Sequence, residues 1–421
     1  MDISYLVRGG TPLKGDVTIS GSKNAALPLL AATLLVQGDT VLDNVPRLSD
    51  TEMMVRILAF LGADVSFEGN TVRINTDKVK NQPIPAEYVS KLRGSIVLLG
   101  PLLARFGVVE MSYPGGCVLG KRPVGPHIEA FEQMGAEDMS TDEVLHLQGT
   151  LHAAHVVLPE FSVTATENVL MAASLLPGET RIDLAAGEPH VQDLQKFLQK
   201  AGVTVDGVGN HTVRVTGKPL LKAVKHRVVS DYLEAGAFVL AGLVTHSNIR
   251  IHEFPTDDLL TFLYTLQKAG CVCTLDSKEG TLSVDGELSS LQAMNVRTNI
   301  FPGFPTDLQA PIGVAMTQAH GVSRMFERLF EGRLAYLYEL EKMGAHVEIL
   351  NSHQALIIGP TPLKGRIVAS NDIRAGCAMV LAALCAEGET TITDVRYIER
   401  GYDKLDEKLR ALGANIVRTE K

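Results

Sequence analysis

The sequence has 421 residues, of which 45% are hydrophobic and 21% are charged, so it can build an ordinary core and disorder is excluded as its main state. This length predicts about two to four domains. Acidic side chains outnumber basic ones by 48 to 39, and the net charge of −9 argues against a broad surface for nucleic acid.

No apolar run reaches the roughly 20 residues that cross a membrane, and the first residues lack the pattern of a secretory signal. Five cysteines form an odd set in a long chain, which is typical of reduced thiols. We therefore predict a cytoplasmic protein that binds neither nucleic acid nor membranes.

Six segments along the chain share a helix end, a glycine and a strand-like run, at intervals of 67 to 74 residues. The shared glycines are Gly62, Gly135, Gly202, Gly270, Gly344 and Gly413. Two unrelated patterns keep the same period: Gly-acid-Thr at 38, 178 and 388, and Thr-Pro-Leu-Lys-Gly at 11 and 361. The chain is therefore predicted to contain six related units of about 70 residues each.

Within a unit, local patterns predict strands and capped helices in turn. Alternating residues over 16–20 predict a strand, and an Ala/Leu-rich helix over 22–35 follows, capped by Ser22. In the last unit, helices are predicted over 372–386 and over 403–412, the second ending at a glycine. Because helical and strand periods alternate throughout, the predicted fold class is α/β.

A break near Val229–Ser230 separates the third copy from the fourth and predicts two domains of three units each. The first would comprise residues 22–229. The second would be discontinuous, with residues 1–21 and 230–421, because the repeated Thr-Pro-Leu-Lys-Gly string indicates that the N-terminal strand region completes the last unit. We predict an active site in the cleft between the two domains.

The loop over 114–123 carries Cys117 after two glycines and before a basic pair. Lys121 and Arg122 would lower the pKa of this thiol from its ordinary value of about 8.5. The alternative is a surface loop with an incidental cysteine. The loop is also a near miss for a phosphate-binding P-loop, which would need Ser or Thr where Arg122 stands.

Several units supply a cation near a helix start or a turn, although the protein is acidic overall. The charged residues in these places are Lys23, Asp307, Arg333, Asp372, Arg374 and Arg400. Each alone is more often a surface residue. Together they predict a cationic site for a small molecule with several negative charges. Cys271-x-Cys273 has no second pair, so no metal site is predicted.

Six motifs, in this order, resemble those of the UDP-N-acetylglucosamine 1-carboxyvinyltransferases, the enolpyruvyl transferases that begin peptidoglycan precursor synthesis. They are GSKNAALP at Gly21, PGGC at Pro114, NVRT at Asn295, FPTD at Phe304, DIRA at Asp372 and RGYDKLDEKLRALGA at Arg400. The resemblance covers the chain from its first strand to its last helix. It implies two inverted α/β domains, each of three repeated units, in agreement with the count of six.

The resemblance implies transfer of the enolpyruvyl group of phosphoenolpyruvate to the 3′-hydroxyl of UDP-N-acetylglucosamine. Phosphate is released through a tetrahedral intermediate, and no cofactor is needed. Cys117 would protonate the enolpyruvyl carbon, and it matches the thiol that fosfomycin alkylates in susceptible members. Asp307 would accept the hydroxyl proton as the C–O bond forms.

The complete set of catalytic residues implied by the resemblance is Cys117, Asp307, Lys23, Arg122 and Arg400. The implied substrate-binding residues are Asn24, Arg93, Pro123, Val124, His127, Ser162, Val163, Arg333, Asp372 and Arg374. Several guanidinium groups suit phosphoenolpyruvate, which carries both a carboxylate and a phosphate.

The sequence departs from the family pattern at Val97, Gly125, Glu160 and Thr164. All four lie in the first domain, on the side where the resemblance places the nucleotide sugar. Gly125 and Thr164 keep open a weakly catalytic paralogue that binds the nucleotide sugar or a protein partner. A 5-enolpyruvylshikimate-3-phosphate synthase is the other alternative, and the Pro-Gly-Gly-Cys loop argues against it.

Overall fold

The computed structural model describes residues 3–115 and 124–420. The chain forms two compact units. We call residues 21–115 and 124–229 the central unit, and residues 3–20 and 230–420 the terminal unit, because both ends of the described chain belong to it. Cys117, Arg122 and Pro123 lie outside the described residues.

The described part of the terminal unit contains three four-stranded sheets. One has the order β21 (Ile367–Ala369), β22 (Glu389–Thr393), β1 (Ile3–Arg8) and β23 (Asn415–Glu420). Another has the order β15 (Val272–Asp276), β16 (Thr281–Asp285), β14 (Asn248–His252) and β2 (Lys14–Thr18). The third has the order β17 (Asn295–Arg297), β18 (Gly321–Phe326), β20 (Gln354–Gly359) and β19 (His346–Asn351).

The N-terminal segment contributes to two of these sheets. β1 lies between β22 and β23 and is antiparallel to both, with Tyr5 opposite Ile392 and Arg418. β2 lies at the edge of a different sheet, parallel to β14. The strands over residues 3–8 and 14–18 are thus built into sheets whose other strands come from the second half of the chain.

The central unit has three sheets among its described residues. Two are four-stranded: β13 (Lys225–Arg227), β3 (Asp39–Asp43), β5 (Thr71–Asn75) and β4 (Asp64–Glu68), then β11 (Thr204–Asp206), β12 (Thr212–Thr216), β10 (Glu179–Asp183) and β9 (His155–Val157). The third is three-stranded, with β6 (Val108–Ser112), β8 (Val144–Gln148) and β7 (Glu137–Asp138). In each four-stranded sheet of both units, one edge strand pairs in parallel and the other pairings are antiparallel.

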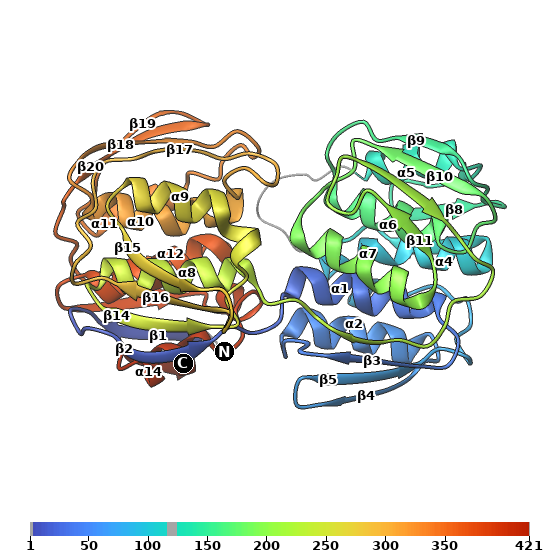
Figure 1. Cartoon of the computed structure of the whole chain (residues 1–421), viewed down its shortest axis with the longest axis horizontal. Helices are drawn as coiled ribbons and strands as arrows, with labels where there is room; N and C mark the ends of the chain where they lie inside the picture. Colours follow the sequence, from blue (N-terminus) through green and yellow to red (C-terminus); the bar gives the residue numbers. More distant parts are fainter. Residues whose placement is uncertain (1–2, 116–123, 421) are drawn as a thin grey trace. The chain divides into compact units, whose positions relative to one another are not determined.

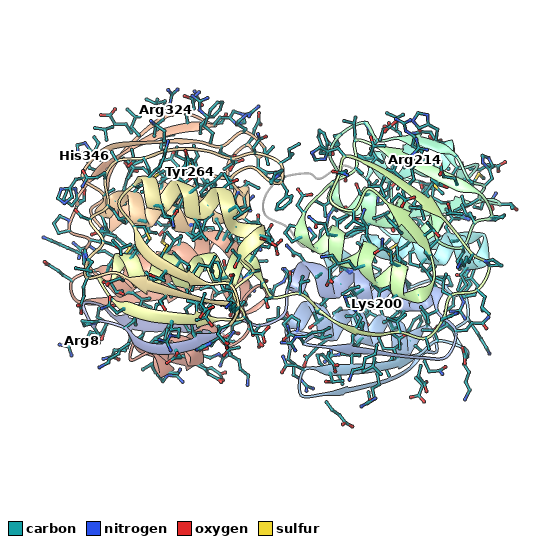
Figure 2. All side chains as sticks on the ribbon, in the orientation of Figure 1. Arg8, Lys200, Arg214, Tyr264, Arg324 and His346 are labelled. Carbon is teal, nitrogen blue, oxygen red and sulfur yellow. The ribbon has the colours of Figure 1, made fainter. Side chains whose placement is uncertain are left out.

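Helices fill the space enclosed by the three sheets of each unit, as Figure 1 shows. In the terminal unit, α8 (Tyr232–Val244), α10 (Gln309–Gln318) and α12 (Ile373–Cys385) pack against one another in the core. All residues of α8 are buried, as expected for a helix that is apolar on all sides except at Glu234 in its first turn. Arg324 on β18 and His346 on β19 are exposed and point away from this core (Figure 2).

Shorter helices complete the terminal unit: η3 (Thr256–Leu259), α9 (Leu260–Lys268), η4 (Thr306–Leu308), α11 (Tyr336–Lys342), α13 (Arg396–Glu399) and α14 (Leu405–Ala411). The central unit contains α1 (Lys23–Ala32), η1 (Thr33–Leu35), α2 (Ser49–Phe60), α3 (Ala86–Val89), η2 (Arg93–Leu98), α4 (Leu99–Phe106), α5 (Gly125–Gln133), α6 (Val163–Ala173) and α7 (Pro189–Ala201).

The six glycines that defined the repeat all have positive φ, between 95° and 106°. Each follows a helix, and its left-handed conformation turns the chain into the next segment, where a residue with a Cβ atom would be strained. The repeat predicted from the sequence is therefore built on one recurring helix ending. With three sheets around buried helices in each unit, the α/β fold class is confirmed.

The predicted elements are close to the observed ones, with three corrections. The strand predicted over 16–20 is β2, Lys14–Thr18, and the helix predicted over 22–35 is α1 followed by the 3₁₀ turn η1. The helix predicted from residue 403 begins only at Leu405, because Lys404 has a φ of 52° and its left-handed backbone cannot continue a helix. No helix among the described residues has the length and apolar character to cross a membrane.

A buried polar cluster holds Ser20, the last residue of the N-terminal segment, inside the terminal unit. Its backbone N–H donates to Glu234 Oε2 at 2.7 Å, and Lys408 Nζ donates to Glu234 Oε1 at 2.6 Å and to Ser20 Oγ at 2.7 Å. Burial raises the pKa of Glu234 to about 7, although the charge of Lys408 lowers it in part.

This pKa predicts how stability changes with pH. Between pH 4.5 and about 7, unfolded Glu234 loses its proton while folded Glu234 keeps it, so the free energy of unfolding should fall as pH rises. Relative to Glu234→Gln, the wild type should lose roughly 1.4 kcal/mol per pH unit across this interval. Urea denaturation at a series of pH values measures the slope. Glu287→Gln, at an exposed carboxylate, should keep the wild-type slope; equal slopes for Glu234→Gln and the wild type would refute the assignment.

Candidate active site

The Asp307 carboxylate lies between two arginine side chains in the terminal unit. Arg374 donates from Nε and Nη2 to Asp307 Oδ2, at 3.1 and 2.9 Å, and Arg333 Nη2 donates to Oδ1. Both arginines are 5% exposed, whereas the Asp307 side chain is 27% exposed. A small molecule can therefore reach the carboxylate while the protein buries the two cations beside it.

Electrostatics in this cluster strongly favour the charged form of Asp307. Burial alone would raise the pKa of the carboxyl group, but the guanidinium groups of Arg374 and Arg333 hold it well below its usual range. For Arg374, burial would lower the pKa, and the negative charge of Asp307 raises it well above the ordinary value. All three groups are charged at neutral pH.

One arginine nitrogen in the cluster has no partner among the described residues. Arg333 Nε is buried and makes no hydrogen bond to them. Guanidinium groups bind phosphate and carboxylate groups through charge-assisted hydrogen bonds, so the cluster suits an anion that approaches Asp307.

Helix α12 positions Arg374. Asp372 caps its N-terminus by accepting hydrogen bonds from the backbone N–H groups of Arg374 and Ala375, at 2.7 and 2.9 Å. The Arg374 guanidinium carbon also lies 5.4 Å from the centre of the Tyr402 ring, a cation–π contact. The Asp372 carboxylate thus stabilises the N-terminus of α12.

Arg400 precedes Gly401, which packs closely against the start of α12. A Cβ atom added to Gly401 would lie 2.2 Å from Cγ2 of Ile373, so only glycine allows this close approach to the first residue of α12. Half-buried Arg400 precedes this contact, and Tyr402 follows it. Direct hydrogen bonds join Asp307 to Arg333 and Arg374, and Asp372 is linked to Arg374 through the cap of α12. Arg400 is placed only through its neighbour Gly401, which lies against the first residue of α12.

In the central unit, Lys23 is the first residue of α1, after the Ser22 cap, and is 8% exposed. Its Nζ lies 3.5 Å from Asp50 Oδ2 in α2. Asn24, next to it, is half-buried. Desolvation makes a buried lysine unfavourable without a negative partner, and Asp50 supplies that charge.

His127 in α5 joins two other side chains of the central unit. Its Nδ1 lies 2.8 Å from Asn168 Nδ2, and its Nε2 lies 3.1 Å from Thr164 Oγ1; both partners are on α6. Asn168 Oδ1 accepts a bond from the Gly100 N–H group at 2.7 Å, which fixes the orientation of the amide. Asn168 Nδ2 must then donate to His127 Nδ1, so His127 carries its proton on Nε2 and donates to Thr164.

The remaining substrate-binding candidates among the described residues of the central unit lie at the starts of η2, α5 and α6. Arg93, at the start of η2, donates from Nη1 to the Pro114 carbonyl oxygen at 2.8 Å, immediately before the segment outside the described residues. Val124 precedes α5, and Ser162 caps α6 by accepting from the Ala165 N–H group at 3.4 Å. Val163 is the first residue of α6 and is half-buried.

The four departures from the family pattern have different environments. Val97 is buried in the core at 2% exposure, and Glu160 is exposed. Gly125 is the first residue of α5. Thr164 is the departure with a defined polar contact, because it accepts the His127 proton described above.

Four residues that were not predicted each contact a predicted residue from a distant segment: Asp50, Asn168, Thr306 and Tyr402. Glu327, which was also not predicted, contacts Thr306. Thr306 and Tyr402 lie inside the Phe-Pro-Thr-Asp and Arg-Gly-Tyr-Asp motifs, so the sequence offered a signal for these two. Across the described part of the chain, no group of three His, Cys, Asp or Glu side chains has the arrangement of a metal site.

Comparison with known proteins gives the class of protein first. A sequence profile of the EPSP synthase (3-phosphoshikimate 1-carboxyvinyltransferase) family matches residues 7–409. The fold matches that of the enolpyruvyl transferase NikO from Streptomyces tendae, with a TM-score of 0.89, 22% identity and 99% coverage of both chains. It also matches an EPSP synthase from Acinetobacter baumannii, with a TM-score of 0.77, 18% identity and full coverage of both chains.

Relatives with higher sequence identity narrow the class. A UDP-N-acetylglucosamine 1-carboxyvinyltransferase from Methylacidiphilum infernorum is 41% identical over 419 residues, covering 98% of each chain. One from Magnetococcus marinus is 40% identical over 415 residues, again covering 98% of each. The chain belongs to the EPSP synthase family and, within it, to the UDP-N-acetylglucosamine 1-carboxyvinyltransferases. The resemblance predicted from the six motifs is confirmed.

The hydrogen bonds of His127 predict its protonation state. Burial, followed by the charge of Arg93, lowers the pKa of His127 to about 3. Ring ¹⁵N NMR signals should therefore show a neutral ring with the proton on Nε2, unchanged from pH 8 to pH 4. In Asn168→Asp, a carboxylate would face Nδ1 and favour the charged ring, so the pKa should rise and the ring should titrate within this interval.

Asn210→Asp is the matched control, since Asn210 is exposed in the same unit and should leave the His127 signals unchanged. A wild-type ring with its proton on Nδ1, or a titration above pH 5, would contradict the proposed arrangement of Asn168 and Thr164.

Proposed function

We propose that this protein transfers the enolpyruvyl group of phosphoenolpyruvate to the 3′-hydroxyl of UDP-N-acetylglucosamine and releases phosphate. The reaction would be the first committed step of peptidoglycan precursor synthesis and would take place in the cytoplasm. Full-length similarity to relatives bearing that enzyme name supports the reaction. The observation that carries the chemistry is the Asp307 carboxylate between two buried arginines.

The proposed reaction has an addition and an elimination step. The 3′-hydroxyl oxygen bonds to C2 of phosphoenolpyruvate, a proton adds to C3, and the hydroxyl proton passes to a base. C3 then returns a proton while the C2–O bond to phosphate breaks, which restores the double bond. Asp307 is assigned as the base and Cys117 as the acid at C3, and neither step requires a cofactor.

Asp307 can act as this base only if its pKa rises during the reaction cycle. In the free protein the guanidinium groups of Arg333 and Arg374 hold that pKa low, so the carboxylate has little affinity for a proton. Phosphoenolpyruvate brings a carboxylate and a phosphate, which compete with Asp307 for the same guanidinium groups. We infer that this competition makes Asp307 more basic when the substrate binds.

The remaining residues are assigned to substrate binding from the family resemblance, and the cations among them suit the negative charges of the substrates. Lys23, Arg122 and Arg400 are assigned to the phosphoenolpyruvate phosphate, together with Arg333 and Arg374. Asn24, Arg93, Pro123, Val124, His127, Ser162, Val163 and Asp372 are assigned to substrate binding. For Asp372 the helix cap supports an indirect role, through the position of Arg374.

The first test is phosphate release from phosphoenolpyruvate with either UDP-N-acetylglucosamine or shikimate 3-phosphate as acceptor. Release with the nucleotide sugar alone is expected. Release with shikimate 3-phosphate alone would replace the proposed acceptor. Folded protein that binds the nucleotide sugar in calorimetry but releases no phosphate would be a binding paralogue, and the proposal would fail.

A second test addresses Asp307. Asp307→Asn keeps the shape of the side chain but removes its charge, so kcat should fall by roughly 10²–10⁴-fold, the usual contribution of a general base. Asp307→Ala should lose activity as well, and both variants should lower the melting temperature, because two buried arginines would lose their shared anion. Asp257→Ala, at an exposed aspartate of the same unit, is the control. Unchanged phosphate release by folded Asp307→Asn would refute the assigned base.

A further inference from the structure

Glu327 is a fully buried carboxylate that follows strand β18, with an exposed fraction of 0%. Its backbone is fixed on both sides by one residue: the Glu327 N–H group donates to the His353 carbonyl at 2.8 Å, and the Glu327 carbonyl lies 2.8 Å from His353 Nδ1. A buried carboxylate is unfavourable unless it is well paired, so its partners show what the charge holds in place.

Four donors surround the carboxylate of Glu327. Oε1 accepts from Thr298 Oγ1 at 2.9 Å and from the backbone N–H groups of Leu329 and Phe330, at 2.8 and 3.2 Å. Oε2 accepts from Thr306 Oγ1 at 2.7 Å. The carboxylate therefore ties together the segment after β17, the Phe-Pro-Thr-Asp turn and the loop that leads to Arg333.

The Thr306 hydroxyl connects Glu327 to the candidate active site. Arg333 Nη1 donates to Thr306 Oγ1 at 2.8 Å. A guanidinium group can only donate and an ionised carboxylate can only accept, so the hydroxyl accepts from Arg333 and gives its single proton to Glu327. The direction of both hydrogen bonds is thereby fixed.

This chain also determines how Arg333 faces Asp307. With Nη1 held by Thr306, Nη2 of the same planar group donates to Asp307 Oδ1. Thr306 and Asp307 are adjacent in η4, so Arg333 bonds two consecutive side chains in a bidentate manner. Free rotation of the long arginine side chain is removed at both nitrogens.

Charge balance supports the same role. Two guanidinium groups and the single Asp307 carboxylate leave one surplus positive charge in a buried place. Burial lowers the pKa of Arg374, and Asp307, followed by Tyr402 and Asp231, raises it. On the Arg333 side, Glu327 places a negative charge one hydroxyl group away.

We propose that Glu327 is a positioning residue: through the Thr306 hydroxyl it orients Arg333 against Asp307. It touches neither substrate nor reacting atoms. The inference rests on the proposed function for its catalytic consequence, but the orientation of Arg333 can be measured without any reaction.

Glu327→Gln tests the direction of the hydrogen bonds with little change in shape. The amide oxygen would keep the three bonds made by Oε1, and the amide nitrogen would face Thr306. The hydroxyl would then have two donors directed at it and no acceptor for its own proton. Arg333 should lose its fixed position, and kcat should fall by roughly 10- to 100-fold, the usual range for outer residues that orient a site. The KM for UDP-N-acetylglucosamine should change little.

Thr306 provides a matched pair of variants. Thr306→Ser keeps the hydroxyl and should retain nearly all activity, whereas Thr306→Val removes it at similar volume and should resemble Glu327→Gln. If both residues act through one chain, the double variant of Glu327→Gln and Thr306→Val should be no slower than the slower single variant. If the double variant instead loses activity by the product of the two single-variant factors, the proposal is wrong.

Kinetics, melting temperature and crystal structures of the variants complete the experiment, with Glu348→Gln, at an exposed carboxylate of β19, as control. The proposal expects folded Glu327→Gln with reduced kcat and with Arg333 displaced from Asp307. Wild-type kcat in this variant, or Arg333 still bonded to Thr306 and Asp307 in its crystal structure, would overturn it. If the wild type itself releases no phosphate, the proposed function fails, and the crystal structure of Glu327→Gln alone decides the positioning role.

Discussion

Two buried guanidinium groups share one carboxylate, and the organisation of the terminal unit around Asp307 depends on that contact. Neither Arg333 nor Arg374 could be desolvated at 5% exposure without a negative partner, since an unpaired buried charge costs several kcal/mol. Asp307 pairs with both and stays partly exposed itself. The protein thus concentrates positive charge at one accessible carboxylate, although its net charge is −9.

Helices and turns around this contact hold the side chains of Asp307, Arg333 and Arg374 in one geometry. Arg374 is fixed by the capped first turn of α12 and by the Tyr402 ring. Arg333 lies in a turn and not in a helix. Its guanidinium group is held instead by the hydrogen bonds that run from Glu327 through the Thr306 hydroxyl. Rigid positioning matters because electrostatic stabilisation of a transition state is strongest when the donors need no reorganisation.

Much of the fold could be predicted from the sequence because its signals are local. A helix cap such as Asp372 and a left-handed glycine such as Gly413 act within a few residues, so the sequence near each of them is enough to predict it. The glycine recurs in all six repeats. The start of α14 was predicted wrongly because nothing in the composition of this segment indicates the left-handed backbone of Lys404. Lysine has no special preference for that conformation.

The site was predictable only in part, for a related reason. Motifs identified Asp307 and Arg374 as separate candidates, but the two are 67 residues apart, and only folding shows that they bond directly. Glu327 and Asn168 gave no signal, because a buried carboxylate or amide looks like any surface residue until its partners are known. Their hydrogen bonds reach 21 to 72 residues along the chain.

The pairing of Asp307 with two arginines has a chemical consequence for the proposed mechanism. A carboxylate whose pKa is held below its ordinary range is a poor base, so the resting geometry stabilises the ion pair at the expense of proton transfer. In the proposed mechanism an anionic substrate would reverse this preference, because each guanidinium N–H that turned to a phosphate or carboxylate would be withdrawn from Asp307. Basicity would then appear only when phosphoenolpyruvate is bound, which couples proton removal from the acceptor hydroxyl to the presence of the group that is to be transferred.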